Sequence, residues 1–550
     1  MKYFPDRLTI AWLQKSYAAG ELTPAELMQE ILRRSAAHLE KNIWITPPSA
    51  EFIQKYIDRL PAYDPALPLW GVPFSIKDNI DLAGVATTAA CPAYAYTPRE
   101  NAPVAQKLIL AGAIPVGKTN MDQFATGLTG TRSPYGEAHN AYQPELISGG
   151  SSSGAAVSVA LGLAAFALGT DTAGSGRVPA ALHSLIGYKP PVGAWSTEGV
   201  VPACASIDCV TVFACNLADA ALVDKTVRGT DVAPRPPEKI LLPEREPEFF
   251  GDYAEIYRSK WQQALRRIEH LDIPVEFIDI TVFEKAARIL YEGAYIAERW
   301  AALGEFIDTH PGALLPVTES ILRTGKDKTA AALFRDIHAL QEYRTEVRRI
   351  LADRVLILPT AGGTFTREQV RQDPIGANSK MGLYTNHCNL LDLCAVAVPE
   401  NEADRTLPFG LTIFALTANE ALFFKTAELF LDNVKCKIAV CGLHKKGYPL
   451  EYQLRELGAD YSGRSRTAAN YRLYALDTDP PKPGLVRGGG ASVEVDIFEL
   501  SRSKLGAFMQ NVKAPLAIGN IELSDGSVVK GFLCEPYAVE KAADITETGF

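Results

Sequence analysis

Two turns rich in glycine and serine, together with one upstream lysine, have the residue types of an acyl-transfer site. The first turn reads Gly149-Gly-Ser-Ser-Ser-Gly154, and the second reads Gly169-Thr-Asp-Thr-Ala-Gly-Ser-Gly-Arg177. Such turns can hold a serine hydroxyl in an exposed position and aim main-chain N–H groups at a developing oxyanion. The lysine is Lys77, in the apolar run Gly71-Val-Pro-Phe-Ser-Ile-Lys77. Serine hydroxyls with a lysine base are one variant of serine-based nucleophilic catalysis.

Each feature alone has a simpler interpretation. A serine before an apolar run is often a helix cap, and a lysine among apolar residues is often a surface residue that extends its ammonium into water. Lysine acts as a base only after it loses a proton, which burial among Val72, Phe74 and Ile76 would favour. The three features in one chain therefore favour the catalytic interpretation of Lys77.

The two turns and the lysine segment resemble the amidase signature family. The two serines are 175 − 151 = 24 residues apart, as that family's pattern requires. The resemblance implies that Lys77 is the base, that Ser151 is a bridging serine on a cis peptide bond, and that Ser175 is the nucleophile. In the implied relay Lys77 takes the proton of Ser151, Ser151 takes that of Ser175, and Ser175 attacks an amide carbonyl.

The main chain of the second turn supplies the expected oxyanion hole. Its candidate donors are the N–H groups of Thr172, Ala173, Gly174 and Ser175. For Ser153 and Asp171 we expect only hydrogen bonding within the turns. Arg177 is expected to brace the nucleophile turn rather than to react.

Three further segments resemble allophanate hydrolases: Gly127–Gly136, Tyr291–Trp300 and Gly382–Asp392. The resemblance implies that Tyr291 and Arg299 bind the substrate carboxylate, and that Gly127 belongs to the same site. Tyr291 and Arg299 are eight residues apart on a helix expected over 284–303, so both project from similar faces. A guanidinium can bind a carboxylate through two parallel hydrogen bonds. The alternative is a helix with one core aromatic residue and one solvated arginine.

The resemblance implies hydrolysis of allophanate (urea-1-carboxylate) at its terminal amide. Ammonia would leave, and the carboxycarbamate would decarboxylate to carbon dioxide and further ammonia. One alternative is another amidase-signature hydrolase that acts on a biuret-like or other small amide. A second is a component of an amidotransferase complex, against which the acidic charge and the fused C-terminal region argue.

The elements expected around these residues indicate an α/β fold. Residues 1–60 read as mainly helical, with a helix over 24–34 that begins at Thr23-Pro24. Alternating strands and helices then predict a central mixed, twisted β-sheet flanked by helices over residues 1–432. The expected strands lie at 68–75, 113–117 and 355–359, and the expected helices at 103–111, 155–168, 284–303 and 418–431.

The pattern changes after residue 432. Residues 436–550 contain short alternating strands, which predict a small α+β domain of mainly β character. The segments around His444 and Glu494 resemble the C-terminal domain of allophanate hydrolases, which is similar to the γ-glutamyl cyclotransferase fold. The resemblance implies a role in the second stage of the reaction, with His444 and Glu494 as candidates. A docking or dimer-forming module is an equal alternative.

Bulk properties indicate an ordinary enzyme. The net charge of −9 argues against a nucleic-acid or anionic-membrane surface, and 47% hydrophobic with 22% charged residues is typical of globular proteins. Nine irregularly spaced cysteines and the absence of a signal pattern predict reduced thiols in the cytoplasm. No spacing predicts a metal site or a cofactor. The resemblance implies a homodimer, with an upstream enzyme (urea carboxylase or a cyanuric-acid pathway hydrolase) as a candidate partner.

Overall fold

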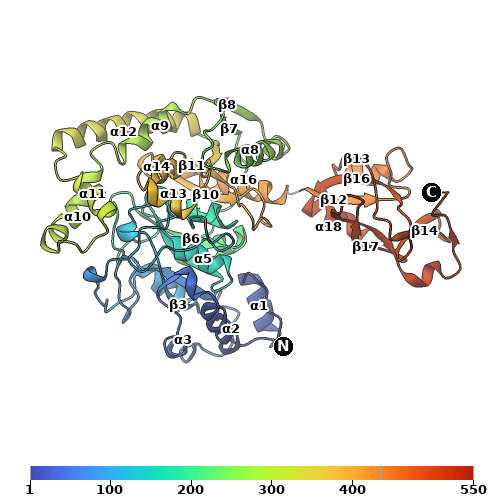
Figure 1. Ribbon diagram of the computed structural model, residues 1–550, viewed down its shortest axis with the longest axis horizontal. Coiled ribbons are helices and arrows are strands. Elements are labelled where there is room, and N and C mark those ends of the chain that lie inside the picture. The colour runs from blue at the N-terminus through green and yellow to red at the C-terminus, as the bar shows by residue number, and fades with distance from the viewer. Residues whose placement is uncertain (1, 434, 549) are drawn as a thin grey trace. The chain divides into compact units, whose positions relative to one another are not determined.

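The computed structural model describes residues 2–433, 435–548 and 550, and the chain divides into two compact units. Met1–Glu428 forms the first unit and Leu429–Phe550 the second. Among the described residues the first unit holds one 11-stranded sheet, and the second holds a 5-stranded and a 3-stranded sheet (Figure 1). The predicted fold class, a mixed sheet flanked by helices plus a small domain of mainly strands, is confirmed.

The strands of the first unit are β1 (Trp44–Thr46), β2 (Pro73–Lys77), β3 (Ile114–Thr119), β4 (Phe166–Asp171), β5 (Ile186–Lys189), β6 (Cys209–Ala214), β7 (Lys239–Pro243), β8 (Val275–Ile278), β9 (Arg354–Pro359), β10 (Leu393–Pro399) and β11 (Gly410–Leu416). Its α-helices are α1 (Ile10–Ala18), α2 (Pro24–Ala36), α3 (Ala50–Ile57), α4 (Pro103–Leu110), α5 (Ser153–Ala160), α6 (Val178–Ala181), α7 (Leu217–Arg228), α8 (Ala254–Glu269), α9 (Thr281–Ile289), α10 (Ile296–Thr309), α11 (Pro316–Arg323), α12 (Ala330–Leu351), α13 (Arg367–Gln372), α14 (Gly376–Met381) and α15 (His387–Leu390). Helix α16 (Glu420–Asp432) extends into the second unit.

The centre of the large sheet brings the two predicted chemical segments to one edge. The strand order is β1-β3-β2-β4-β6-β5-β10-β11-β9-β7-β8, and β2 runs parallel to both β3 and β4. Ile76 pairs with Leu168, so the carboxyl end of β2, at Lys77, meets that of β4, at Asp171. Polar residues that follow parallel strands therefore gather at this edge.

The expected helix over 155–168 is wrong in its second half. Helix α5 ends at Ala160, and residues 166–171 form β4 in the middle of the sheet. Gly162 turns the chain with φ of +63°, and a side chain there would collide with the carbonyl of Asp6. A continuous apolar run does not distinguish a buried helix from a buried strand, and here it contains both.

The expected single helix over 284–303 is also wrong. Helix α9 ends at Ile289, a turn follows, and α10 begins at Ile296. In the turn, the Asp336 carboxylate accepts a hydrogen bond from the Ala294 main-chain N–H at 2.5 Å, and Gly293 leaves the space that this contact needs. Helix α12, which carries Asp336, packs beside α9 (Figure 1).

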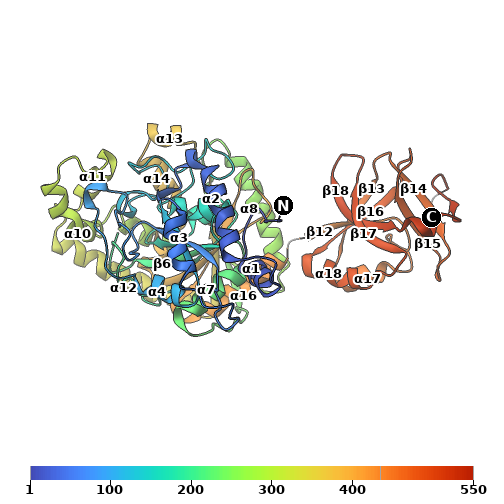
Figure 2. The same cartoon turned by 90° about the horizontal axis from the view of Figure 1, so that it is seen from below.

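The expected strand over 68–75 is wrong in its first part, because Gly71 turns the chain with φ of +70° and β2 begins only at Pro73. The other predicted elements are confirmed with small changes at their ends. Helix α2 begins with a capping box between Thr23 and Glu26 and a proline at its first position. Helices α2 and α3 contact each other (Figure 2), and α3 also contacts β3. No helix within the described ranges is long and apolar enough to cross a membrane.

The second unit is a three-layer arrangement. Its strands are β12 (Lys435–Val440), β13 (Asp460–Arg466), β14 (Tyr471–Leu476), β15 (Lys482–Arg487), β16 (Glu494–Ser501), β17 (Leu516–Glu522), β18 (Val528–Cys534) and β19 (Ala543–Asp544). Its helices are α17 (Glu451–Glu456) and α18 (Arg502–Gln510). One core joins these helices to the five-stranded sheet β13-β16-β12-β18-β17, and a second core joins that sheet to β15-β14-β19. Helices α17 and α18 lie near each other in Figure 2.

Candidate active site

Lys77 is fully buried at the end of β2 and lies beside two hydroxyl groups. Its Nζ is 2.7 Å from Ser151 Oγ and 2.7 Å from Thr170 Oγ1. Burial lowers the pKa of Lys77 to about 7, and the negative charge of Asp122 is the largest influence in the opposite direction. A neutral amine can donate to one hydroxyl and accept a proton from the other, so this geometry suits a general base.

Ser151 lies in the loop that precedes α5, and the Gly150–Ser151 peptide bond is cis. The next residue holds the loop to β4, because Ser152 Oγ donates to Thr170 O at 3.1 Å and accepts from Thr170 N at 3.3 Å. Asp122 holds it from the other side, since its N–H donates to Ser151 O at 3.1 Å. These contacts fix Ser151 against Lys77.

The second turn is organised by Asp171 and Arg177, which are both fully buried. Arg177 donates to both carboxylate oxygens of Asp171 at 2.9 Å. The same carboxylate accepts from the N–H groups of Gly174 (2.8 Å) and Gly176 (3.0 Å). The expected turn hydrogen bonding of Asp171 and bracing by Arg177 are present. Ser153 Oγ likewise donates to a main-chain carbonyl, Asn120 O, at 3.2 Å.

Of the four expected oxyanion donors, one already has a hydrogen-bond acceptor within the described parts of the chain and three do not. The Gly174 N–H is occupied by Asp171, whereas those of Thr172, Ala173 and Ser175 have no acceptor among the described residues. Ser175 is 3% exposed, and within the same ranges its hydroxyl makes no hydrogen bond, including to Ser151. The structure thus contains the first link of the relay, Lys77 to Ser151, and not the second.

A segment distant in the sequence holds the nucleophile turn from outside. Thr385 Oγ1 donates to Ala173 O at 2.7 Å, and Asn389 Nδ2 donates to Asp171 O at 2.8 Å. Gly174 has φ of +128°, and a Cβ there would lie 2.7 Å from Thr385 Cβ. The Gly382–Asp392 segment therefore supports the turn directly.

Tyr291 and Arg299 meet although they do not share a helix. Tyr291 lies in the turn between α9 and α10, and Arg299 lies in α10 and is 1% exposed. Arg299 Nη2 is 3.3 Å from the Tyr291 hydroxyl, and Nη1 donates to Thr126 Oγ1 at 3.0 Å. Tyr291 and Arg299 therefore lie close together because of the turn between α9 and α10, and not because they share a helix face as the sequence predicted.

Gly127 lies one residue after Thr126 and is buried. A Cβ at Gly127 would lie 2.6 Å from Asp122 Oδ2. The Asp122 carboxylate also accepts from the N–H groups of Gly130 (3.0 Å) and Arg132 (2.8 Å). Segment 122–132 thus joins the Ser151 loop to the Arg299 side of the site.

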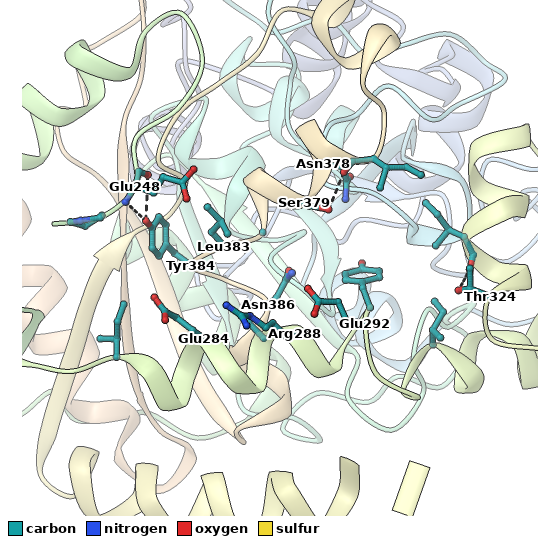
Figure 3. Close-up of a pocket in the computed structure, with 18 of the residues that line it drawn as sticks. Glu248, Glu284, Arg288, Glu292, Thr324, Asn378, Ser379, Leu383, Tyr384 and Asn386 are labelled. Carbon is teal, nitrogen blue, oxygen red and sulfur yellow. Dashed lines mark hydrogen bonds between the residues drawn. The ribbon is translucent and has the colours of Figure 1, made fainter. Parts of the chain in front are cut away.

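A cavity of about 740 Å³ opens beside these residues. Its wall includes Tyr291, Arg132 and the chain on both sides of Thr385. Figure 3 shows Glu284, Arg288 and Glu292 along one side, with Asn378 and Ser379 across from them. Lys77, Ser151 and Ser175 do not line the cavity, which borders the nucleophile turn through the segment around Thr385.

The two C-terminal candidates have different surroundings. His444 is half-buried, stacks on Phe532 with ring centroids 5.2 Å apart, and has its Nε2 2.9 Å from Gln453 Oε1. Burial lowers the pKa of His444. Glu494 pairs with Lys445 at 2.8 Å, and within the described residues it shares no hydrogen bond with His444.

Sequence reasoning missed Thr170, Asp122, Thr126 and Arg132 as parts of the site. Thr170 belongs to the second turn, where a hydroxyl at the end of a central strand is a usable signal. The other three lie between 122 and 132, and their positions relative to Lys77 and Arg299 depend on contacts between distant segments. No group of three His, Cys, Asp or Glu side chains in the described parts of the chain could hold a metal ion.

Comparisons with known proteins extend over both units. The amidase family matches residues 26–424, and the allophanate hydrolase C-terminal domain matches residues 436–550. Urea amidolyase of Saccharomyces cerevisiae is 36% identical over 98% of this chain, which spans about a third (32%) of that relative's length. Mandelamide hydrolase of Pseudomonas putida is 32% identical over 52% of this chain and 59% of its own length.

A solved structure of Kluyveromyces lactis allophanate hydrolase has a TM-score of 0.71 and 34% identity, and the match covers 98% of both chains. That match and the two family matches confirm the resemblance inferred from the sequence. The chain belongs to the amidase family and carries an allophanate hydrolase C-terminal domain.

Proposed function

We propose that this protein hydrolyses allophanate at its terminal amide through an acyl-enzyme. The observation that carries the proposal is the buried Lys77–Ser151 contact of 2.7 Å in the unit that also holds the Arg299–Tyr291 pair. The first supplies a base for serine, and the second supplies a cation for a carboxylate. Similarity over both units to Kluyveromyces lactis allophanate hydrolase supports the choice of substrate.

In the proposed mechanism neutral Lys77 accepts the proton of Ser151 while Ser151 accepts that of Ser175. Ser175 Oγ attacks the amide carbonyl, and the N–H groups of Thr172, Ala173 and Ser175 stabilise the oxyanion. The relay then reverses and protonates the amino group of the tetrahedral intermediate, so that the C–N bond breaks and ammonia leaves, and water hydrolyses the acyl-enzyme. The mechanism requires the Ser151 and Ser175 hydroxyls to come within hydrogen-bond distance when substrate is bound, since catalytic hydrogen bonds often tighten in the complex.

Arg299 and Tyr291 are proposed to bind the allophanate carboxylate, with Gly127 in the same part of the site. Arg299 is buried and has no ion-pair partner among the described residues. Asp208 attracts Arg299 only at longer range, and a substrate carboxylate would supply the direct ion pair that a buried guanidinium favours. A biuret-like neutral amide is the second candidate substrate. The amidotransferase alternative has weaker support, because a Deinococcus deserti glutamyl-tRNA(Gln) amidotransferase chain, 39% identical, aligns with only 44% of this protein.

We further propose that residues 1–432 form the catalytic domain and that residues 436–550 act on the carboxycarbamate product. The C-terminal candidates are His444 and Glu494. The contact of His444 with Gln453 and its aromatic packing fit a structural histidine equally well. A homodimer, a cytoplasmic location and association with an upstream enzyme such as urea carboxylase remain parts of this proposal.

The experiment is ammonia release from freshly prepared allophanate by the intact protein and by Ser175→Ala. We expect release that is lost in Ser175→Ala and retained in the matched control Ser153→Ala. Among the described residues, the Ser153 hydroxyl bonds only to a main-chain carbonyl. Release from other amides but not from allophanate would retain the mechanism and remove the substrate assignment. Equal activity of Ser175→Ala and the intact protein would remove both.

A further inference from the structure

Arg132 is a buried arginine in the cavity wall to which the proposed mechanism gives no role. It is 3% exposed, and it lines the same 740 Å³ cavity as Tyr291. Its Nη1 donates to Thr126 O at 2.8 Å, and its Nη2 donates to Pro374 O at 2.5 Å. Its Nε is buried and has no hydrogen-bond partner in the described parts of the chain. One donor of this guanidinium therefore remains unsatisfied.

Within the described ranges no carboxylate forms an ion pair with Arg132, and the charge of Asp122 acts on it only at longer range, where it opposes the effect of burial on the pKa of Arg132. The nearby carboxylate of Asp122 accepts main-chain N–H groups, including that of Arg132, and forms no ion pair with the guanidinium. Arg177, which is also buried, shows the contrast because Asp171 pairs with it at 2.9 Å. Leaving a buried guanidinium without a counter-charge is strongly unfavourable, so this position calls for an anion from elsewhere.

Arg132 and Arg299 form one cationic group around Thr126. Arg132 donates to the carbonyl of Thr126, and Arg299 donates to its hydroxyl at 3.0 Å. Neither guanidinium has an ion-pair partner among the residues that the structure describes. Two guanidinium groups without a direct ion pair in the described ranges thus contact the same residue, and Asp122 and Asp208 attract Arg132 and Arg299 respectively only at longer range.

The acidic side chains of the cavity wall do not offset this charge, because most already have partners. Glu284 pairs with Arg245 at 3.6 Å, Glu246 pairs with Arg258 at 3.3 Å, and Glu248 pairs with Lys380. Figure 3 shows Glu284 and Glu248 in this wall. Of the four carboxylates in the cavity wall, Glu292 is thus the one without an ion pair among the residues that the structure describes.

We propose that Arg132 is a second anion-recognising residue, which makes the cavity select an amide that carries a carboxylate over its neutral isostere. This inference rests on the proposed function and deepens it, because allophanate differs from biuret by a carboxylate in place of a carboxamide. Arg132 supplies charge next to Arg299, and its free Nε–H is a donor for the substrate anion.

The test measures binding, so that it does not depend on turnover. Malonamate and malonamide replace the central N–H of allophanate and biuret by CH2 and differ from each other as a carboxylate differs from a carboxamide. Calorimetry in the Ser175→Ala background gives the dissociation constant of each. We expect Arg132→Gln to raise the dissociation constant of malonamate by about 10- to 100-fold and that of malonamide by less than about threefold. The matched control is Arg245→Gln, a cavity arginine already paired with carboxylates, which should change neither by more than about threefold.

Arg132→Lys keeps the positive charge but loses the planar guanidinium with its paired N–H donors. We expect it to raise the dissociation constant of malonamate by about three- to tenfold. This variant decides the question if Arg132→Gln does not fold. Equal weakening of both ligands, or no change in either, would show that Arg132 only braces the loop and would overturn the inference. Failure of the intact protein to hydrolyse allophanate, with a retained preference for malonamate, would remove the proposed function and leave the role of Arg132 standing.

Discussion

The ionisation of Lys77 predicts the pH dependence of the reaction. Burial brings its pKa to about 7 from an ordinary value of 10.5. At pH 7 about half of the lysine is then neutral, compared with about 0.03% at the ordinary value, a gain of roughly 1,500-fold in active base. The difference corresponds to about 5 kcal/mol between the two protonation states. Only the neutral amine can take the proton of Ser151.

The assay is kcat/KM for ammonia release from fresh allophanate between pH 6 and 9 at constant ionic strength. We expect kcat/KM to fall about tenfold per unit below pH 7 and to level off above about pH 8. Lys77→Arg retains the charge but cannot deprotonate, so it should lower kcat by about a thousandfold or more. A midpoint of the kcat/KM profile near pH 10 would refute the idea of a buried neutral lysine. A kcat/KM that does not change with pH, although the chemical step limits the rate, would refute it as well.

A substitution of Asp122 tests the same assignment of the pH profile to Lys77. Its negative charge is the largest influence that raises the pKa of Lys77 against the effect of burial. Asp122→Asn should therefore move the acidic limb to lower pH, whatever fraction of the variant is folded. A limb that moves to higher pH would mean that Asp122 does not act on Lys77 through charge.

Three further predictions concern the surroundings of the relay. Asp171→Asn leaves Arg177 unpaired in the interior and should cost about 3–5 kcal/mol in the free energy of unfolding, measured by denaturant titration; a loss below about 1 kcal/mol would contradict the bracing role. Gly174→Ala forces a side chain onto φ of +128° and against Thr385, so it should cost about 2–3 kcal/mol and reduce kcat, as unfolding curves and ammonia release would show. Lys77→Met removes a group whose pKa in the folded protein lies below its pKa in the unfolded chain. Burying the charged lysine lowers the free energy of unfolding of the unsubstituted protein, fully below pH 7 and progressively less toward pH 10.5. The stability of the variant relative to the unsubstituted protein should therefore fall by about 1.4 kcal/mol per pH unit across that window, and a pH-independent difference would count against the shifted pKa.

A surface pair provides the control for the Asp171 variant. Arg235 and Asp353 form an ion pair at 2.9 Å, with side chains 50% and 49% exposed. Asp353→Asn should cost less than about 1 kcal/mol, because solvent screens an exposed pair. A similar loss at both sites would show that the effect of Asp171→Asn does not come from burial.

The sequence by itself determined the type of fold and indicated candidates for the chemistry-bearing residues. The two serine turns and the apolar run before Lys77 predicted a serine-based site once their spacing was compared with the amidase signature pattern, because that resemblance implies a nucleophile, a bridging hydroxyl and a base. Helix α2 was predictable from local signals, since its capping box and first-turn proline act within one turn of the chain. The short alternating strands after residue 436 likewise indicated a unit of mainly β character.

Only the tertiary structure decided how the site is completed. The run 155–168 became a helix and a central strand, because burial on all sides removes the periodicity that separates the two. Tyr291 and Arg299 meet across a turn fixed by Asp336, a contact with no local signal. The positive charge around Thr126 depends on which buried arginines lack a carboxylate, and pairing between residues distant in the chain cannot be read from their order. Local patterns thus predict which groups can react, whereas long-range packing sets their ionisation and their partners.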